Sequence, residues 1–82
     1  MKMAKMRINI TFPEDLIKDP IIYNLGKMFD IITNIRRANV EQEVGWVVLE
    51  IEGTDEALRQ GLAYLDEAGV RVDQLDGDVI ES

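Results

Sequence analysis

The sequence predicts an α+β domain in which two helices cover one face of a four-stranded antiparallel sheet. Four segments have the apolar patterns of strands, and two longer segments carry apolar residues at helical spacing. Their order along the chain is strand, helix, strand, strand, helix, strand. With 82 residues the chain has room for one small domain, which we expect to span residues 1–82 with its core at about residues 5–75.

The first strand and the first helix are predicted from residues 6–29. Apolar and polar residues alternate from Met6 to Phe12, and Pro13 is expected to end this strand. Asp19 can cap the free N–H groups of the following helix, and Pro20 fits its first position. Gly26, inside the helix, predicts a close approach to a neighbouring segment. The apolar residues at helical spacing are Ile21, Ile22, Leu25, Met28 and Phe29.

The second strand is predicted at Ile31–Val40, with an irregularity in its middle. The apolar residues change parity between Ile35 and Ala38, so a β-bulge is expected near Arg36 and Arg37. Because of its place in the chain, this strand is expected at the edge of the sheet, where it could also pair with a partner chain.

The third strand is predicted at Trp46–Glu52, after a turn at residues 41–45. Gly45 is expected to give this turn an unusual backbone angle. Within the strand, alternate residues face the two sides of the sheet. Those expected to face the helices are Val47, Leu49 and Ile51.

The second helix and the fourth strand complete the predicted fold. Thr54 is the expected N-cap, and Gly69 ends the helix in the left-handed conformation that glycine allows. The fourth strand is predicted at Val70–Asp73, and the acidic tail from Asp76 is expected to be loose. The apolar stripe of the helix is expected to be Leu58, Gly61, Leu62 and Leu65.

This order of elements is that of the ferredoxin-like βαββαβ fold, which leaves one sheet face uncovered by helices. Trp46 and Val48 are expected on that face among polar residues. Apolar groups rimmed by polar ones are typical of interfaces, and thin domains gain stability by dimerising. We therefore predict a homodimer interface containing Trp46, Val48 and Asn34. The alternative is that Trp46 folds over the sheet edge and contacts only its own chain.

Composition narrows the possible functions. The chain carries a formal net charge of −7, which disfavours nucleic-acid binding, and no apolar run approaches the length of a membrane span. Residues 1–40 hold seven basic and four acidic groups, whereas residues 41–82 hold two basic and twelve acidic groups. The chain has no Cys and no His, so thiol, imidazole and Cys/His metal chemistry are excluded. We expect a cytoplasmic protein with no cofactor and no metal site.

Enzyme activity is not expected. The acidic residues fall in turns, helix starts and the tail, which favours solvation over a paired-carboxylate site. No glycine-rich phosphate loop occurs. An acylphosphatase-like anion loop would follow the first strand, but the residues there are Pro13, Glu14 and Asp15, which would repel phosphate.

Three stretches of the sequence resemble one known family. They are INITFPED, DPIIYNLGKMFDIITNIRRANV and GWVVLEIEGTDEALRQGLAYLDEAGVRVDQL. In this order and spacing they closely resemble the NIL domain. That family occurs as the C-terminal regulatory domain of the ATPase subunit of methionine-importing ABC transporters. It also occurs fused to ferredoxin-type iron–sulfur modules and as short stand-alone proteins.

The resemblance implies a ferredoxin-like fold, homodimerisation through the sheets and, in the transporter members, methionine binding at the dimer interface. The Asn–Ile–Ile stretch of the family maps to Asn34-Ile35. Arg36 or Arg37 can take an amino-acid carboxylate through two hydrogen bonds. The predicted ligand-binding residues are therefore Asn34, Ile35, Arg36 and Arg37. The alternative is that Asn34 caps the bulge and the arginines pair with Glu50 or Glu52 across strands.

Two functions follow from these observations. The first is a non-catalytic regulatory domain that binds an amino acid, such as methionine, as a homodimer. The second is an interaction module that docks to an ABC transporter ATPase or an iron–sulfur ferredoxin without a small ligand.

Overall fold

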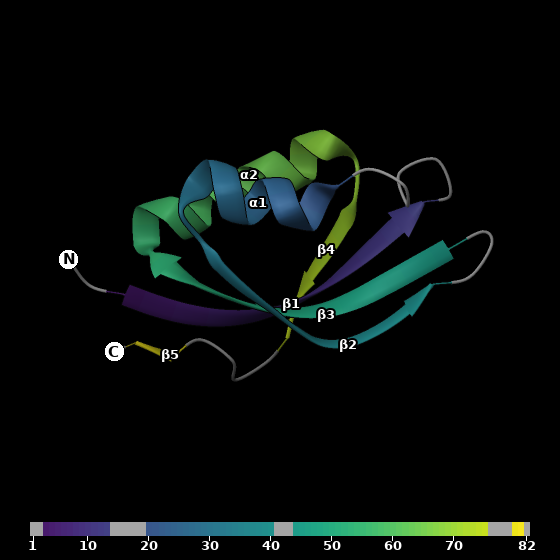
Figure 1. The fold of residues 1–82 in the computed structure, drawn as a ribbon, viewed down its shortest axis with the longest axis horizontal. Helices are drawn as coiled ribbons and strands as arrows, with labels where there is room; N and C mark the ends of the chain where they lie inside the picture. Colours follow the sequence, from purple (N-terminus) through teal and green to yellow (C-terminus); the bar gives the residue numbers. More distant parts are fainter. Residues whose placement is uncertain (1–2, 14–19, 41–43, 76–79, 82) are drawn as a thin grey trace.

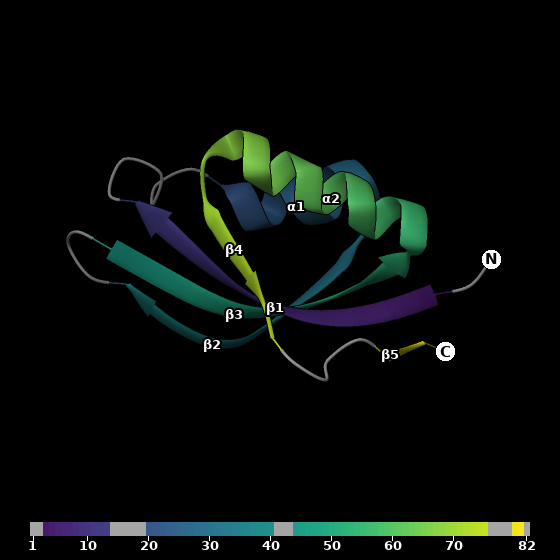
Figure 2. The same cartoon turned by 180° about the vertical axis from the view of Figure 1, so that it is seen from behind.

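The computed structural model describes residues 3–13, 20–40, 44–75 and 80–81 (Figure 1). The strands pair antiparallel in the order β2-β3-β1-β4, and both helices lie on one side of the sheet (Figures 1 and 2). The ferredoxin-like prediction is confirmed. The elements are β1 (Met3–Pro13), α1 (Ile21–Phe29), β2 (Ile32–Val40), β3 (Val44–Thr54), α2 (Asp55–Ala68), β4 (Arg71–Gln74) and β5 (Ile80–Glu81).

The central pair of strands is longer than the sequence predicts. β1 and β3 pair along their whole length, from Met3 opposite Thr54 to Pro13 opposite Val44. The prediction that Gly45 belongs to a turn is wrong, since Gly45 is a buried strand residue opposite Phe12. Continuing the ladder satisfies backbone groups that a turn would leave to solvent. Pro13 is the last residue of β1, an end position at which a missing N–H is tolerated.

The C-terminal segment adds a strand that the sequence did not predict. β4 covers β1 only at Ile8–Thr11, and β5 pairs with β1 further along, at Ala4 and Lys5. The expectation of a loose tail is therefore wrong for Ile80 and Glu81, because backbone groups of β1 beyond β4 remain to be paired. The rest of the predicted tail, from Asp76 to residue 79 and at residue 82, lies outside the described residues.

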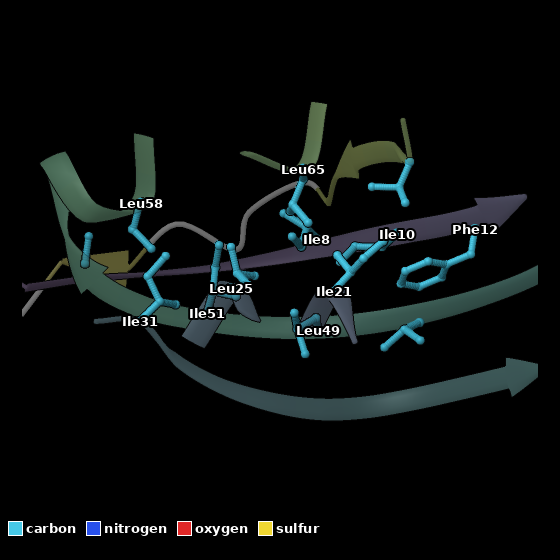
Figure 3. Packing of buried hydrophobic residues seen from close by; sticks show 13 residues of the cluster. Ile8, Ile10, Phe12, Ile21, Leu25, Ile31, Leu49, Ile51, Leu58 and Leu65 are labelled. Atoms are coloured by element: carbon cyan, nitrogen blue, oxygen red, sulfur yellow. The ribbon is translucent and has the colours of Figure 1, made fainter. Parts of the chain in front are cut away.

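The core lies between the helices and one face of the sheet (Figure 3). Alternate residues of the two central strands point into it, as predicted, and both helices contribute buried leucines. Met28 belongs to the predicted helical stripe but is 61% exposed, because α1 buries a narrower face than its apolar residues suggest. The buried side chains at the centre of this core are Ile8, Ile10, Leu25, Leu49, Ile51 and Leu65.

The helix ends follow the predicted capping chemistry with one shift. Thr54 Oγ1 accepts a hydrogen bond from the N–H of Ala57 at 3.1 Å, and Gly69 adopts a left-handed φ of 92°. Pro20 is the N-cap of α1 instead of its first helical residue, a one-residue difference that is common at helix ends. Asp19, the predicted cap, lies outside the described residues.

Two glycines allow close packing around α1. A Cβ atom at Gly26 would lie 3.2 Å from the carbonyl oxygen of Ile31, which confirms the predicted close approach. A Cβ atom at Gly61 of α2 would lie 2.5 Å from Ile31 Cδ1 and 2.9 Å from Leu25 Cδ1. Gly26 therefore lets α1 lie close to the start of β2, and Gly61 lets α2 lie close to α1. Both described helices lie over the same face of the sheet (Figure 2).

Candidate functional site

The sheet face away from the helices, here called the open face, is built by alternation along four strands. Residues directly opposite each other in an antiparallel pair point to the same side. The buried side chains of β1 and β3 face the helices, so the residues between them face away. The register then places on the open face Arg7, Asn9 and Thr11 of β1, Trp46, Val48 and Glu50 of β3, Asn34 and Arg37 of β2, and Arg71 and Asp73 of β4.

A shallow hollow lies in this face. It has a volume of about 290 Å³ and is lined mostly by apolar surface from Trp46, Val48 and Leu75. Asn9 and Thr11 of β1 supply its polar lining. Trp46 and Val48 are only half-buried within the chain, so apolar surface remains for contact with another molecule.

Two ion pairs, each formed by an arginine and a carboxylate, flank the hollow. Arg7 Nη2 lies 3.7 Å from Glu50 Oε2, and Arg71 Nε lies 3.2 Å from Asp73 Oδ2. Because each pair is partly exposed, its contribution to stability is small, at most about 1 kcal/mol. The surface around the hollow thus offers both cationic and anionic groups to a zwitterionic or mixed-charge partner.

Asn9 lines the hollow with a side chain whose carbonyl oxygen is buried. Its Oδ1 atom is shielded from solvent and accepts no hydrogen bond in the structure. A shielded acceptor without a donor costs about 1–3 kcal/mol. Because the chain itself shields this atom, a donor from a ligand or a second protomer reaches it only if the Asn9 side chain rotates.

The structure separates the predicted ligand-binding residues into two groups. Asn34 lies opposite Glu50, and Arg37 lies opposite Val48, so both share the open face with the hollow. Ile35 lies opposite the buried Leu49 and therefore points toward the helix side, where it is 55% exposed. The four predicted residues do not form one continuous site.

The expected bulge explains this separation. The register shifts between Ile35 and Arg37, so Arg36 has no directly opposite residue in β3. Without the shift, Arg37 would share a face with Ile35. Glu50 pairs with Arg7 of β1, so β1 supplies the cross-strand cation that was considered for β2.

Other site types find little support in the described parts of the chain. Within residues 3–13, 20–40, 44–75 and 80–81, no three His, Cys, Asp or Glu side chains form a group suited to a metal ion. Neither described helix has the length and apolar character needed to cross a membrane.

A sequence model of the NIL domain matches residues 6–74. The chain belongs to the NIL domain family. The methionine import ATP-binding protein MetN of Coxiella burnetii (strain RSA 493 / Nine Mile phase I) is 32% identical over 72 residues. That match covers 83% of this chain but only 20% of MetN, so the NIL domain described here spans about a fifth of that relative.

Solved structures support the fold of this NIL domain. The C-terminal domain of an ABC transporter ATP-binding protein from Enterococcus faecalis superposes with a TM-score of 0.75 at 16% identity, covering 88% of this chain and 84% of the other. The de novo designed protein Ferredog-Diesel gives a TM-score of 0.55 at 20% identity, with 84% and 83% covered. At such identities the likeness concerns the fold alone.

Sequence reasoning placed Trp46, Val48 and Asn34 of this NIL domain on the open face, and the structure agrees with that placement. It did not single out Asn9 or Leu75, which line the hollow. The alternation of β1 puts Asn9 on the open face, but its shielding depends on neighbouring strands and has no signal in the sequence.

Proposed function

We propose that this NIL domain is a non-catalytic regulatory module that dimerises through its open face and binds a small apolar amino acid there. Methionine is the first candidate. One observation carries the proposal: the open face holds a hollow lined by Trp46, Val48 and Leu75, with polar and charged side chains around it.

The case for a dimer rests on uncovered apolar surface. Two helices cover one side of the sheet and leave the indole of Trp46 half-buried on the other. An 82-residue domain has a thin core, and a second protomer on this face would bury further apolar area at about 25 cal/mol per Å². A two-fold arrangement would place the two Trp46 residues near one another.

The case for an amino-acid ligand rests on matched chemistry. Arg37 offers a guanidinium for the carboxylate, and Asn34 lies beside it on the same face. The ammonium group can donate to Asn9 Oδ1 once the Asn9 side chain rotates toward the hollow, which an apolar side chain then enters. Ile35 points to the helix side of the sheet and does not face this ligand. Arg36 lies at the bulge, where it has no directly opposite residue in β3.

A regulatory role is consistent with the match to about a fifth of MetN, a methionine import ATP-binding protein. We propose that the domain works beside such an ATP-binding subunit in the cytoplasm. Ligand binding can alter a partner only if it favours one state of association over another.

The proposal is tested by thermal denaturation with added L-methionine. Ligand at 100 times its dissociation constant stabilises the protein by about 2.7 kcal/mol. We expect a rise in melting temperature for the unaltered chain and its loss in Arg37→Ala, while Arg59→Ala, on the outer surface of α2, keeps the rise. The proposal of a methionine ligand fails if millimolar methionine leaves the melting temperature unchanged.

A second candidate is an interaction module that needs no small ligand. The chain matches only one fifth of MetN, so in that relative the equivalent region is one part of a larger protein. The open face would then dock to an ABC transporter ATPase or to an iron–sulfur ferredoxin. Calorimetry with methionine separates the candidates, because only the first predicts heat of binding.

A further inference from the structure

The outer edge of β2 is a second uncovered surface, separate from the open face. Among the described strands, β2 stands at one end of the order β2-β3-β1-β4, so it is an edge strand (Figure 1). One row of its backbone N–H and C=O groups therefore points away from the sheet. Eight of its nine residues are exposed. Such an edge can accept a further strand from another molecule.

The bulge limits where a strand can pair. The register shift at Arg36 interrupts the regular spacing of backbone groups, and bulges at sheet edges terminate pairing. The regular half of β2 beyond the bulge is Arg37–Val40. At its end, Val40 lines a cavity together with residues from the first turn of α1. A short segment of about four residues is what this half can hold.

An apolar cavity adjoins this half of the edge. It has a volume of about 190 Å³ and lies between the start of α1 and the adjoining ends of β2 and β3. Val40 of β2, 67% exposed, and Tyr23 of α1, 63% exposed, stand at it, and Phe12 lies among its lining. The cavity suits one large apolar side chain, and alternate side chains of an added strand point to this same side.

Among the described residues, the charges along the edge strand are positive, although the protein as a whole is acidic. Arg36 and Arg37 lie on the edge strand, and the Lys27 ammonium stands 5.5 Å from the centroid of the Tyr23 ring. Asp30 is the single acidic residue in the described stretch 20–40, whereas the whole chain has a net charge of −7. The glutamates of residues 41–43 lie outside the described residues.

This charge pattern decides between two occupants. A second copy that paired its described β2 residues against β2 would add two more arginines to this edge and no carboxylate, so it would leave Arg36 and Arg37 without opposite charges. An acidic segment would instead place its carboxylates beside Arg36 and Arg37.

We propose that the Arg37–Val40 edge and the adjoining cavity dock a short extended acidic segment of a partner protein, which adds a strand to the sheet and inserts one apolar side chain beside Val40. The edge shares Arg37 with the proposed amino-acid site. Peptide binding and methionine binding are measured separately, so either proposal can fail without the other.

The test uses a fluorescein-labelled synthetic peptide in which glutamate alternates with valine and leucine, and a matched peptide with lysine in place of glutamate. Anisotropy is measured at low and high salt with the full chain. We expect the acidic peptide to bind, binding to weaken with salt, and the lysine peptide to bind at least about tenfold more weakly.

Two variants locate the site. Arg36→Glu should weaken binding of the acidic peptide about tenfold, whereas Arg59→Glu on α2 changes the net charge equally and should have little effect. Amide NMR shifts should centre on Arg37–Val40. Circular dichroism checks that each variant is folded.

Three outcomes would overturn the proposal. They are absence of binding at millimolar peptide, equal binding of the two peptides, and shifts that centre on Val48 and Leu75 at the hollow instead of on Arg37–Val40. The first two comparisons use the unaltered chain, so they remain decisive if a variant fails to fold.

Discussion

Neighbouring residues of β3 should respond very differently to truncation. Leu49 is fully buried between the sheet and the helices, whereas Val48 is half-buried on the open face. Leu49→Ala removes three buried carbons, worth about 0.8 kcal/mol each, or about 2.4 kcal/mol in transfer free energy. The cavity left behind raises the expected loss to about 3–5 kcal/mol.

Val48→Ala serves as the matched control. It removes two partly exposed carbons, so we expect a loss below about 1 kcal/mol in the monomer. The free energy of unfolding is measured by urea denaturation with circular dichroism, at two protein concentrations. In a domain of this size, 1 kcal/mol corresponds to about 4–8 °C in melting temperature, so Leu49→Ala should melt at least about 12 °C lower.

The reasoning is refuted if both variants lose the same free energy, since that would mean that β3 does not alternate between a core side and an open side. A loss for Val48→Ala that grows with protein concentration has a different meaning. It would show that the dimer buries Val48, as the proposed interface requires.

Substitutions at three further positions test the helix ends and the helix packing by thermal denaturation. Thr54→Ala removes the N-cap hydrogen bond and should cost about 1 kcal/mol, whereas Thr54→Ser should cost less; equal losses would deny the cap its role. Gly69→Ala should cost about 1 kcal/mol because its φ is 92°, and an unchanged melting temperature would contradict this. Gly61→Val should cost about 1–3 kcal/mol because even a Cβ atom there would lie 2.5 Å from Ile31, and a more stable variant would show that the helices separate freely.

The sequence predicts the fold well because the core-facing residues of β1 and β3 alternate strictly. Leu49 and Ile8 sit where period-two patterning places them, and the same pattern puts Trp46 on the other side. The parity change within β2 also reveals the bulge, since one extra residue is what reverses the faces.

The sequence does not predict the extent of pairing or the details of the site. Gly45 resembles a turn residue, but pairing on both sides holds it in a strand. β5 forms because β4 is too short to cover β1, a tertiary requirement with no local signal. The division of Ile35 from Arg37 depends on the exact position of the bulge, which the sequence locates only to within two residues.

Sedimentation velocity of the unaltered chain and of Trp46→Glu tests the central claim about the open face most directly. Met28→Glu is the control, because Met28 is an exposed apolar residue on the helix side. The account predicts a dimer for the unaltered chain and for Met28→Glu, and a folded monomer for Trp46→Glu. A monomeric unaltered chain at every concentration, or a Trp46→Glu variant that remains dimeric, would contradict it.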